Sequence, residues 1–109
     1  MEFTSVKEIF TRMAAVFDRG AAAGLDAIIQ FNIEGDEGGD WYATIKDQTC
    51  TVYVGVYDNP TLSLRMSDKN WIALCKGDLN AVIAFMSGKL KAKGDLMLAQ
   101  RMPKLFSIG

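Results

Sequence analysis

Few side chains in this chain of 109 residues are suited to acid–base or nucleophilic chemistry. The sequence contains no histidine, which excludes Ser-His-Asp and Cys-His catalysis and argues against a catalytic zinc site. Asp26 and Tyr53 are the best acid–base candidates, because both are expected near the centre of a sheet. The alternation of apolar and polar residues around them places both side chains away from the core, so we expect no catalytic role for them.

The remaining sequence motifs also argue against catalysis and against a bound metal. Two cysteines, Cys50 and Cys75, are too few for a small disulfide framework, and we expect buried thiols in a reducing compartment. The acidic segment Gly35–Asp40 lacks the ligand spacing of a calcium loop and is expected to form a turn. There is no phosphate-binding glycine motif and no Gly-x-Ser-x-Gly nucleophile elbow. We therefore expect no cofactor, no metal and no enzymatic activity.

The apolar residues favour binding instead. Hydrophobic residues make up 50% of the chain, so a domain of this size must either bury an unusual share of them or present apolar surface. The candidates on one sheet face are Phe31, Ile33, Trp41, Ile45, Val54, Leu64 and Met66. The candidates from helices over that face are Phe85, Met86, Leu98, Met102, Leu105 and Phe106. Six methionines adapt readily to guests of variable shape, although a close-packed core is the alternative.

The net charge of −1 argues against general affinity for nucleic acid, but the charges are unevenly placed. Residues 88–109 hold five basic residues and one acidic residue, whereas residues 1–87 hold seven and twelve. Lys89, Lys91 and Lys93 alternate with apolar residues on a predicted strand. We expect them to keep the surface soluble and protect a strand edge. Contact with a carboxylate, a CoA phosphate or an anionic membrane surface is the other interpretation.

The positions of these residues follow from elements that the sequence predicts. Apolar spacing and capping residues predict helices at 5–17, 67–77, 78–88 and after Gly94-Asp95, with a kink or fraying at Pro103. Alternating patterns predict strands at 25–34, 41–46, 51–57, 61–66 and 89–93. The first four strands are expected as a meander. Residues 1–109 therefore predict one α+β domain, a mainly antiparallel five-stranded sheet with helices covering one face.

One segment is similar to a known family. The stretch AFMSGKLKAKGD from Ala84 to Asp95, followed by Leu98-Ala99, closely resembles the signature of the sterol carrier protein two domain. Further matches are Phe31, Trp41 after an acidic glycine turn, and Met66-Ser67-Asp68. The resemblance implies an apolar tunnel between sheet and helices that binds fatty acids, fatty acyl-CoA, sterols or related lipids without catalysis.

This sequence also departs from the family pattern. Ala92 stands where a larger aliphatic residue is common, so we expect an enlarged or looser interior. Gln48 stands at a turn position where glycine is frequent.

The resulting hypothesis is a non-catalytic lipid carrier, acting as a monomer or weak dimer with at most transient membrane contact. We expect a cytoplasmic, stand-alone member of bacterial type, because the sequence has no long apolar run, no signal peptide at its start and no peroxisomal Ser-Lys-Leu end. The last helix, with Leu105, Phe106 and Ile108, is the expected lid. Two alternatives remain open: an interaction module whose tunnel is filled, and a small isomerase acting on an apolar substrate.

Overall fold

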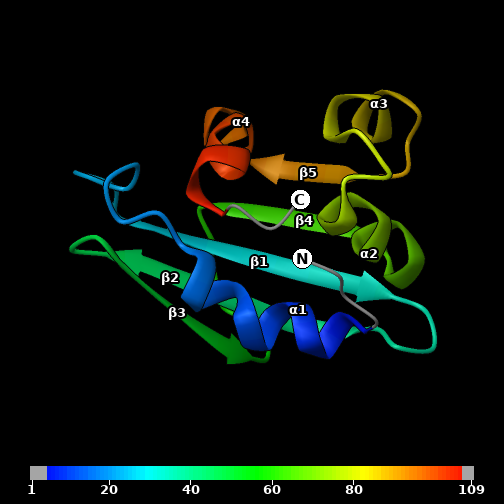
Figure 1. Cartoon of the computed structure of the whole chain (residues 1–109), viewed down its shortest axis with the longest axis horizontal. Helices are drawn as coiled ribbons and strands as arrows, with labels where there is room; N and C mark the ends of the chain where they lie inside the picture. The colour runs from blue at the N-terminus through cyan, green and yellow to red at the C-terminus, as the bar shows by residue number, and fades with distance from the viewer. Residues whose placement is uncertain (1–4, 107–109) are drawn as a thin grey trace.

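The computed structural model describes residues 5–106, which form helices and a single five-stranded sheet (Figure 1). The helices are α1 (Val6–Met13), α2 (Asp68–Lys76), α3 (Ala81–Met86) and α4 (Leu96–Leu105), with a 3-10 turn η1 (Ala14–Val16) after α1. The strands are β1 (Ala27–Glu34), β2 (Gly39–Lys46), β3 (Thr49–Val54), β4 (Leu62–Ser67) and β5 (Lys91–Gly94).

The sheet has the strand order β3-β2-β1-β4-β5. The β1–β4 pair is parallel and the other three pairs are antiparallel, which confirms a mainly antiparallel α+β sheet. The predicted four-strand meander is wrong, because β4 lies beside β1 and not beside β3. Residues 55–61 carry the chain from the β3 edge across the sheet. The alternation of apolar and polar residues along a strand defines which face of the sheet each side chain occupies. It does not define which strand lies beside it.

This crossover is held by Gln30, a buried polar residue on the face away from the helices. Its Nε2 donates to the carbonyl oxygens of Trp41, at 3.0 Å, and Gly55, at 3.1 Å. Its Oε1 accepts from the amide of Tyr57 at 2.8 Å. A buried amide with all these bonds is stable, whereas an unpaired one would cost free energy. β3 therefore ends at Val54, earlier than the predicted Tyr57.

Several element boundaries follow from capping residues. Ser5, Ser67 and Asp95 accept hydrogen bonds from amides in the first turns of α1, α2 and α4, as their positions predict. α3 begins later than the predicted start at residue 78, because Asn80 caps it by accepting from the amides of residues 82 and 83. β5 begins two residues later than predicted, since the amides of residues 89 and 90 still bond to the carbonyl of residue 84. α4 continues through position 103 to Leu105.

The turn between β2 and β3 explains the glycine preference at position 48. Asp47 and Gln48 both have positive φ, at 52° and 61°, which glycine adopts more easily than other residues. Here Gln48 Nε2 donates to the carbonyl of Arg19 at 3.0 Å, and Arg19 Nε donates to the carbonyl of Gln48 at 3.1 Å. These reciprocal bonds fix the turn without a glycine.

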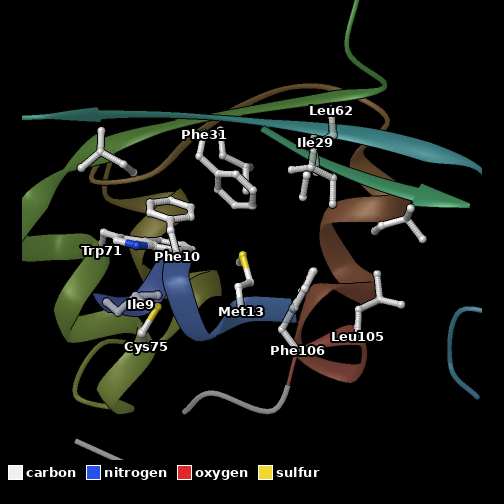
Figure 2. Close-up of a cluster of buried hydrophobic side chains, with 14 of the residues drawn as sticks. Ile9, Phe10, Met13, Ile29, Phe31, Leu62, Trp71, Cys75, Leu105 and Phe106 are labelled. Carbon is white, nitrogen blue, oxygen red and sulfur yellow. The ribbon is translucent and has the colours of Figure 1, made fainter. Parts of the chain in front are cut away.

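The helices lie against one face of the sheet, and an aromatic cluster fills part of the space between them (Figure 2). Strand register places Phe31 beside both Trp41 and Leu64 on that face. Phe10 of α1 stacks on Trp41 with ring centroids 4.4 Å apart, and on Trp71 of α2 at 5.3 Å. It meets Phe31 edge-on at 5.2 Å. These contacts close the interior where α1 crosses the sheet.

The acidic turn after β1 is tied to the start of α2 by Asp68. The buried carboxylate accepts from the amides of Glu37, at 3.1 Å, and Lys69, at 2.8 Å. Gly35 has φ of +109°, and a Cβ there would lie 2.5 Å from Asp68 Oδ1, so only glycine permits this approach. Hydrogen bonds from the Glu37 and Lys69 amides lower the pKa of Asp68 below its ordinary value.

We expect Asp68→Asn to lower the free energy of unfolding at pH 7, because the amide replaces a charged acceptor. A carboxyl whose pKa is depressed in the folded state stabilises above its unfolded pKa, about 4, and loses that contribution as the pH falls further. The gap between wild type and variant should therefore shrink below about pH 4 in urea titrations at several pH values. Asp58→Asn, at an exposed position, is the matched control. A gap that stays constant between pH 7 and pH 3 would contradict the assignment.

Candidate functional site

A cavity of about 770 Å³ lies between the β4–β5 half of the sheet and helices α2, α3 and α4. Figure 2 shows Met13, Trp71 and Phe106 beneath the sheet, from α1, from α2 and from the residue that follows α4. The lining consists of Met13, Leu64, Met66, Trp71, Leu74, Cys75, Leu79, Ala81, Val82, Phe85, Leu90, Ala92, Leu96, Ala99, Gln100, Met102 and Phe106. None of these residues carries a charge, so the site favours hydrocarbon.

The cavity reaches the surface at α3 and α4. Val82, Phe85 and Leu96 line it and are also exposed, at 66%, 47% and 47%. Beside them on α3 and α4, Ile83, Met86 and Met97 are exposed without lining the cavity. Apolar side chains at the rim of an apolar hollow are typical of a site through which a hydrophobic ligand passes.

An enclosed dry cavity of this size could not persist. At about 24 cal/mol per Å³, its cost would be roughly 18 kcal/mol, more than the whole stability of an ordinary domain. The hollow must therefore hold water or a ligand, or close by movement of its walls. Its apolar lining offers water few hydrogen bonds, which favours a ligand or a movement.

Part of the sequence prediction coincides with this cavity. Leu64 and Met66 of β4, Phe85 of α3, Met102 of α4 and Phe106 all line it. They come together because they lie at the β4–β5 side of the sheet.

The remaining predicted residues do not line the cavity. Strand register does place Val54, Trp41, Phe31 and Leu64 on one face, but the face is too wide for one cavity. Where α1 crosses it, Trp41 is covered by Phe10. Val54 at the β3 edge and Met86 on α3 are 83% and 80% exposed. The rest are buried in the packed core: Phe31, Ile33, Ile45, Leu98 and Leu105.

The prediction missed the contribution of α2 and of the small residues. Trp71, Leu74 and Cys75 form the apolar side of α2, a pattern visible in the sequence, and they line the cavity. Ala92 also lines it, which agrees with the expectation that this small residue enlarges the interior. The others missed are Met13, Leu79, Ala81, Val82, Leu90, Leu96, Ala99 and Gln100.

The lysines lie away from the cavity. Lys91 and Lys93 pair with Arg65 and Ser63, so they point to the face opposite the helices. Lys89 precedes β5 and is exposed. β5 is an edge strand, the place where charged side chains hinder pairing with another chain. None of the three lines the cavity.

The acid–base candidates are also outside the cavity. Asp26 is exposed just before β1, and Tyr53 is 45% exposed on the face away from the helices, where it contacts Tyr42. Within residues 5–106, no three cysteine or acidic side chains gather closely enough to hold a metal ion. The same part of the chain has no helix long and apolar enough to cross a membrane.

The end of α4, the predicted lid, is buried and tied to the segment after α1 in this structure. Leu105 and Phe106 are buried, and the Leu105 carbonyl accepts from the amide of Asp18 at 2.8 Å. Phe106 also packs against Phe17, with ring centroids 5.4 Å apart. Ile108, the third residue of the predicted lid, lies outside the described residues. α3 is held more loosely, because Ala84 is its single buried residue.

Comparison with known proteins agrees with this architecture. Residues 6–107 match the model of the SCP-2 sterol transfer family. The chain belongs to this family. In the solution structure of palmitated SCP2L2 from Aedes aegypti, a chain 25% identical superimposes with a TM-score of 0.73 over 93% of each chain. The resemblance drawn from residues 84–95 is thereby confirmed, and family membership supports a general role in lipid binding or transfer.

Longer proteins contain a similar domain. Hydroxysteroid dehydrogenase-like protein 2 of Rattus norvegicus is 30% identical over 106 residues, which is 96% of this chain and 20% of that protein. The sec-alkyl sulfatase PisA1 superimposes with a TM-score of 0.82 at 20% identity, over 97% of this chain and 17% of that one. The chain thus spans about a fifth of these proteins, and the likeness to the sulfatase is one of fold.

We expect Cys75 to resist thiol reagents. It is 2% exposed on the cavity wall, and burial raises its pKa to about 12. At pH 8, roughly one thiol in ten thousand would then be ionised. In a Cys50→Ser variant, maleimide labelling followed by mass spectrometry should proceed at least about a hundredfold more slowly in buffer than in urea. Comparable rates in buffer and urea would mean that the α2 wall of the cavity is open to water.

Proposed function

We propose that this chain is a non-catalytic lipid-binding domain, which holds a fatty acid, a fatty acyl-CoA, a sterol or a similar apolar molecule between the sheet and helices α2, α3 and α4. The observation that carries the proposal is the uncharged cavity of about 770 Å³. Sites for small molecules commonly measure about 300–1,000 Å³. The family match and the palmitated relative support the same conclusion. The free thiols Cys50 and Cys75 support a reducing compartment such as the cytoplasm.

Burial of an acyl chain supplies enough free energy for such binding. A sixteen-carbon chain contributes roughly 12 kcal/mol at about 0.8 kcal/mol per methylene. Association and ordering cost at least about 4 kcal/mol, which leaves binding in the micromolar range or tighter. Because hydrophobic burial is not directional, chain length should influence affinity strongly until the cavity is full.

The two alternatives have less support. An interaction module with a filled interior would not need the hollow beside β4 and β5. An isomerase would need an acid or base facing its substrate, but Asp26 and Tyr53 are outside the cavity and no carboxylate of residues 5–106 lines it.

We expect Ala92→Phe to weaken binding of a fluorescent acyl probe at least about tenfold, because the new ring occupies the cavity beside β5. Ala23→Phe introduces the same ring at an exposed position outside the cavity and should leave binding unchanged. Thermal unfolding of both variants checks that the fold is retained. Equal affinities for wild type and Ala92→Phe would place the lipid elsewhere.

Entry of the ligand should depend on α3. Because Ala84 is its single buried residue, its amides should exchange with deuterium at least about tenfold faster than those near the end of α4 in the empty protein. Bound lipid contacting Val82 and Phe85 should slow that exchange. Hydrogen exchange followed by mass spectrometry measures both effects. Equal protection of α3 and α4 in the empty protein would exclude α3 as the moving wall.

A further inference from the structure

Helices α3 and α4 carry apolar side chains that contribute to neither the core nor the cavity lining. Ile83, Met86 and Met97 are 62%, 80% and 77% exposed, and none of them lines the cavity. On α3 the exposed apolar side chains lie on the sides of the helix away from Ala84, its single buried residue. Apolar side chains left in water in such a group are typical of a surface that meets an apolar partner.

The same two helices form the rim of the cavity. Val82 and Phe85 of α3 and Leu96 of α4 line the hollow and are also exposed. Figure 1 shows α3 and α4 at opposite ends of β5, on the same side of the molecule. The exposed apolar residues of both helices form the α3–α4 face: Val82, Ile83, Phe85, Met86, Leu96 and Met97. A partner on this face would therefore lie over the mouth of the cavity.

The acidic residues next to the α3–α4 face are engaged within the chain. Asp95, before α4, accepts hydrogen bonds from two amides in the first turn of that helix, at 3.0 and 3.2 Å. Asp78, before α3, lies 3.9 Å from the ammonium group of Lys76. Residues 76–106 contain no other carboxylate side chain. The face therefore has little negative charge to repel an anionic partner.

The basic residues of the same segment have no acidic partner within residues 5–106. Lys104 lies about two turns beyond Met97 and so on nearly the same side of α4. Lys89 follows the carboxyl end of α3. Neither lysine forms an ion pair with a described residue. Arg101 donates to the carbonyl of Ala21 and keeps its charge. The charge around the α3–α4 face is therefore positive.

An anionic lipid surface fits these features better than a second copy of the chain does. In a symmetric dimer each contact surface faces its own copy, so the unpaired lysines would meet a surface of like charge. A bilayer with anionic lipids offers negative head groups and hydrocarbon beneath them. It would also place the mouth of the cavity against a phase that an apolar ligand can enter.

We propose that the chain docks on an anionic lipid surface through the α3–α4 face, with its apolar side chains in the interfacial layer and Lys89 and Lys104 at the head groups. Lys91 and Lys93 take no part, because they point to the face of the sheet opposite the helices. Exchange of a ligand through the mouth rests on the proposed function, whereas docking needs no occupied cavity.

Flotation with vesicles of phosphatidylcholine, with or without about 30% phosphatidylserine, tests the docking. Wild type should bind the anionic vesicles at least about tenfold more tightly than the neutral ones. Met86→Gln with Met97→Gln should weaken that binding at least about tenfold, because two apolar side chains no longer enter the interface. Val54→Thr with Val56→Thr alters two exposed apolar residues in and after β3 and is the matched control, which should bind as wild type does.

A second pair of variants tests the charges. Lys89→Gln with Lys104→Gln should weaken binding to the anionic vesicles at least about tenfold. Lys91→Gln with Lys93→Gln lowers the net charge equally on the opposite face and should weaken binding less than about threefold. Equal losses in the two variants would show that net charge governs binding, which contradicts docking through the α3–α4 face. Circular dichroism checks that each variant is folded.

The outcomes separate docking from the proposed function. Vesicle binding that the two methionine substitutions leave unchanged would overturn the inference, and so would a wild type that floats with neither kind of vesicle. A dimer in sedimentation that these substitutions dissociate, without vesicle binding, would mean that a second copy covers the face. A fluorescent acyl probe in vesicle-free buffer should bind wild type and the methionine variant equally. Its failure to bind either would reject the proposed function, while flotation still decides the docking.

Discussion

The helices fill one face of the sheet unequally, and the cavity exists because of that difference. Where α1 crosses the β1–β2–β3 part, Phe10 stacks on Trp41 and Trp71, and the interior is closed by rings in contact. Beside β4 and β5, the wall residues include the small Ala92 and Ala99, and α3 buries only Ala84. Protein interiors are otherwise packed as densely as organic crystals, so a hollow of about 770 Å³ is a strong departure that a ligand can relieve.

The polar residues that stabilise the fold are also separate from the residues that line the cavity. Gln30 and Asp68 each satisfy several backbone groups, one holding the crossover after β3 and the other the turn after β1. Both lie outside the cavity lining, and so do Asp26, Tyr53 and the β5 lysines. Among residues 5–106, no charged side chain therefore lines the cavity. In the proposed function, affinity comes from nondirectional hydrocarbon burial.

Local features of the sequence predicted much of this fold. Caps at Ser5, Ser67 and Asp95 depend on neighbouring amides, and strand faces depend on alternation, so both could be read from the chain. The strand that pairs with β4 could not be predicted, because the Gln30 contacts that hold the crossover join residues far apart in sequence. For a similar reason, only part of the site could be predicted from the sequence. Alternation placed Phe31 and Leu64 on one face, but only the position of α1 decides that Phe31 is covered and Leu64 lines the cavity.

The methionines allow the most direct measurement of whether the hollow holds a lipid chain. Met13, Met66 and Met102 line the cavity, whereas Met86 and Met97 are exposed without lining it. In protein labelled with ¹³C at the methionine methyls, bound palmitic acid should give nuclear Overhauser contacts from its chain to the three lining methyls and change their shifts. Contacts confined to Met86 and Met97, or none at all, would contradict a lipid site beneath β4 and β5.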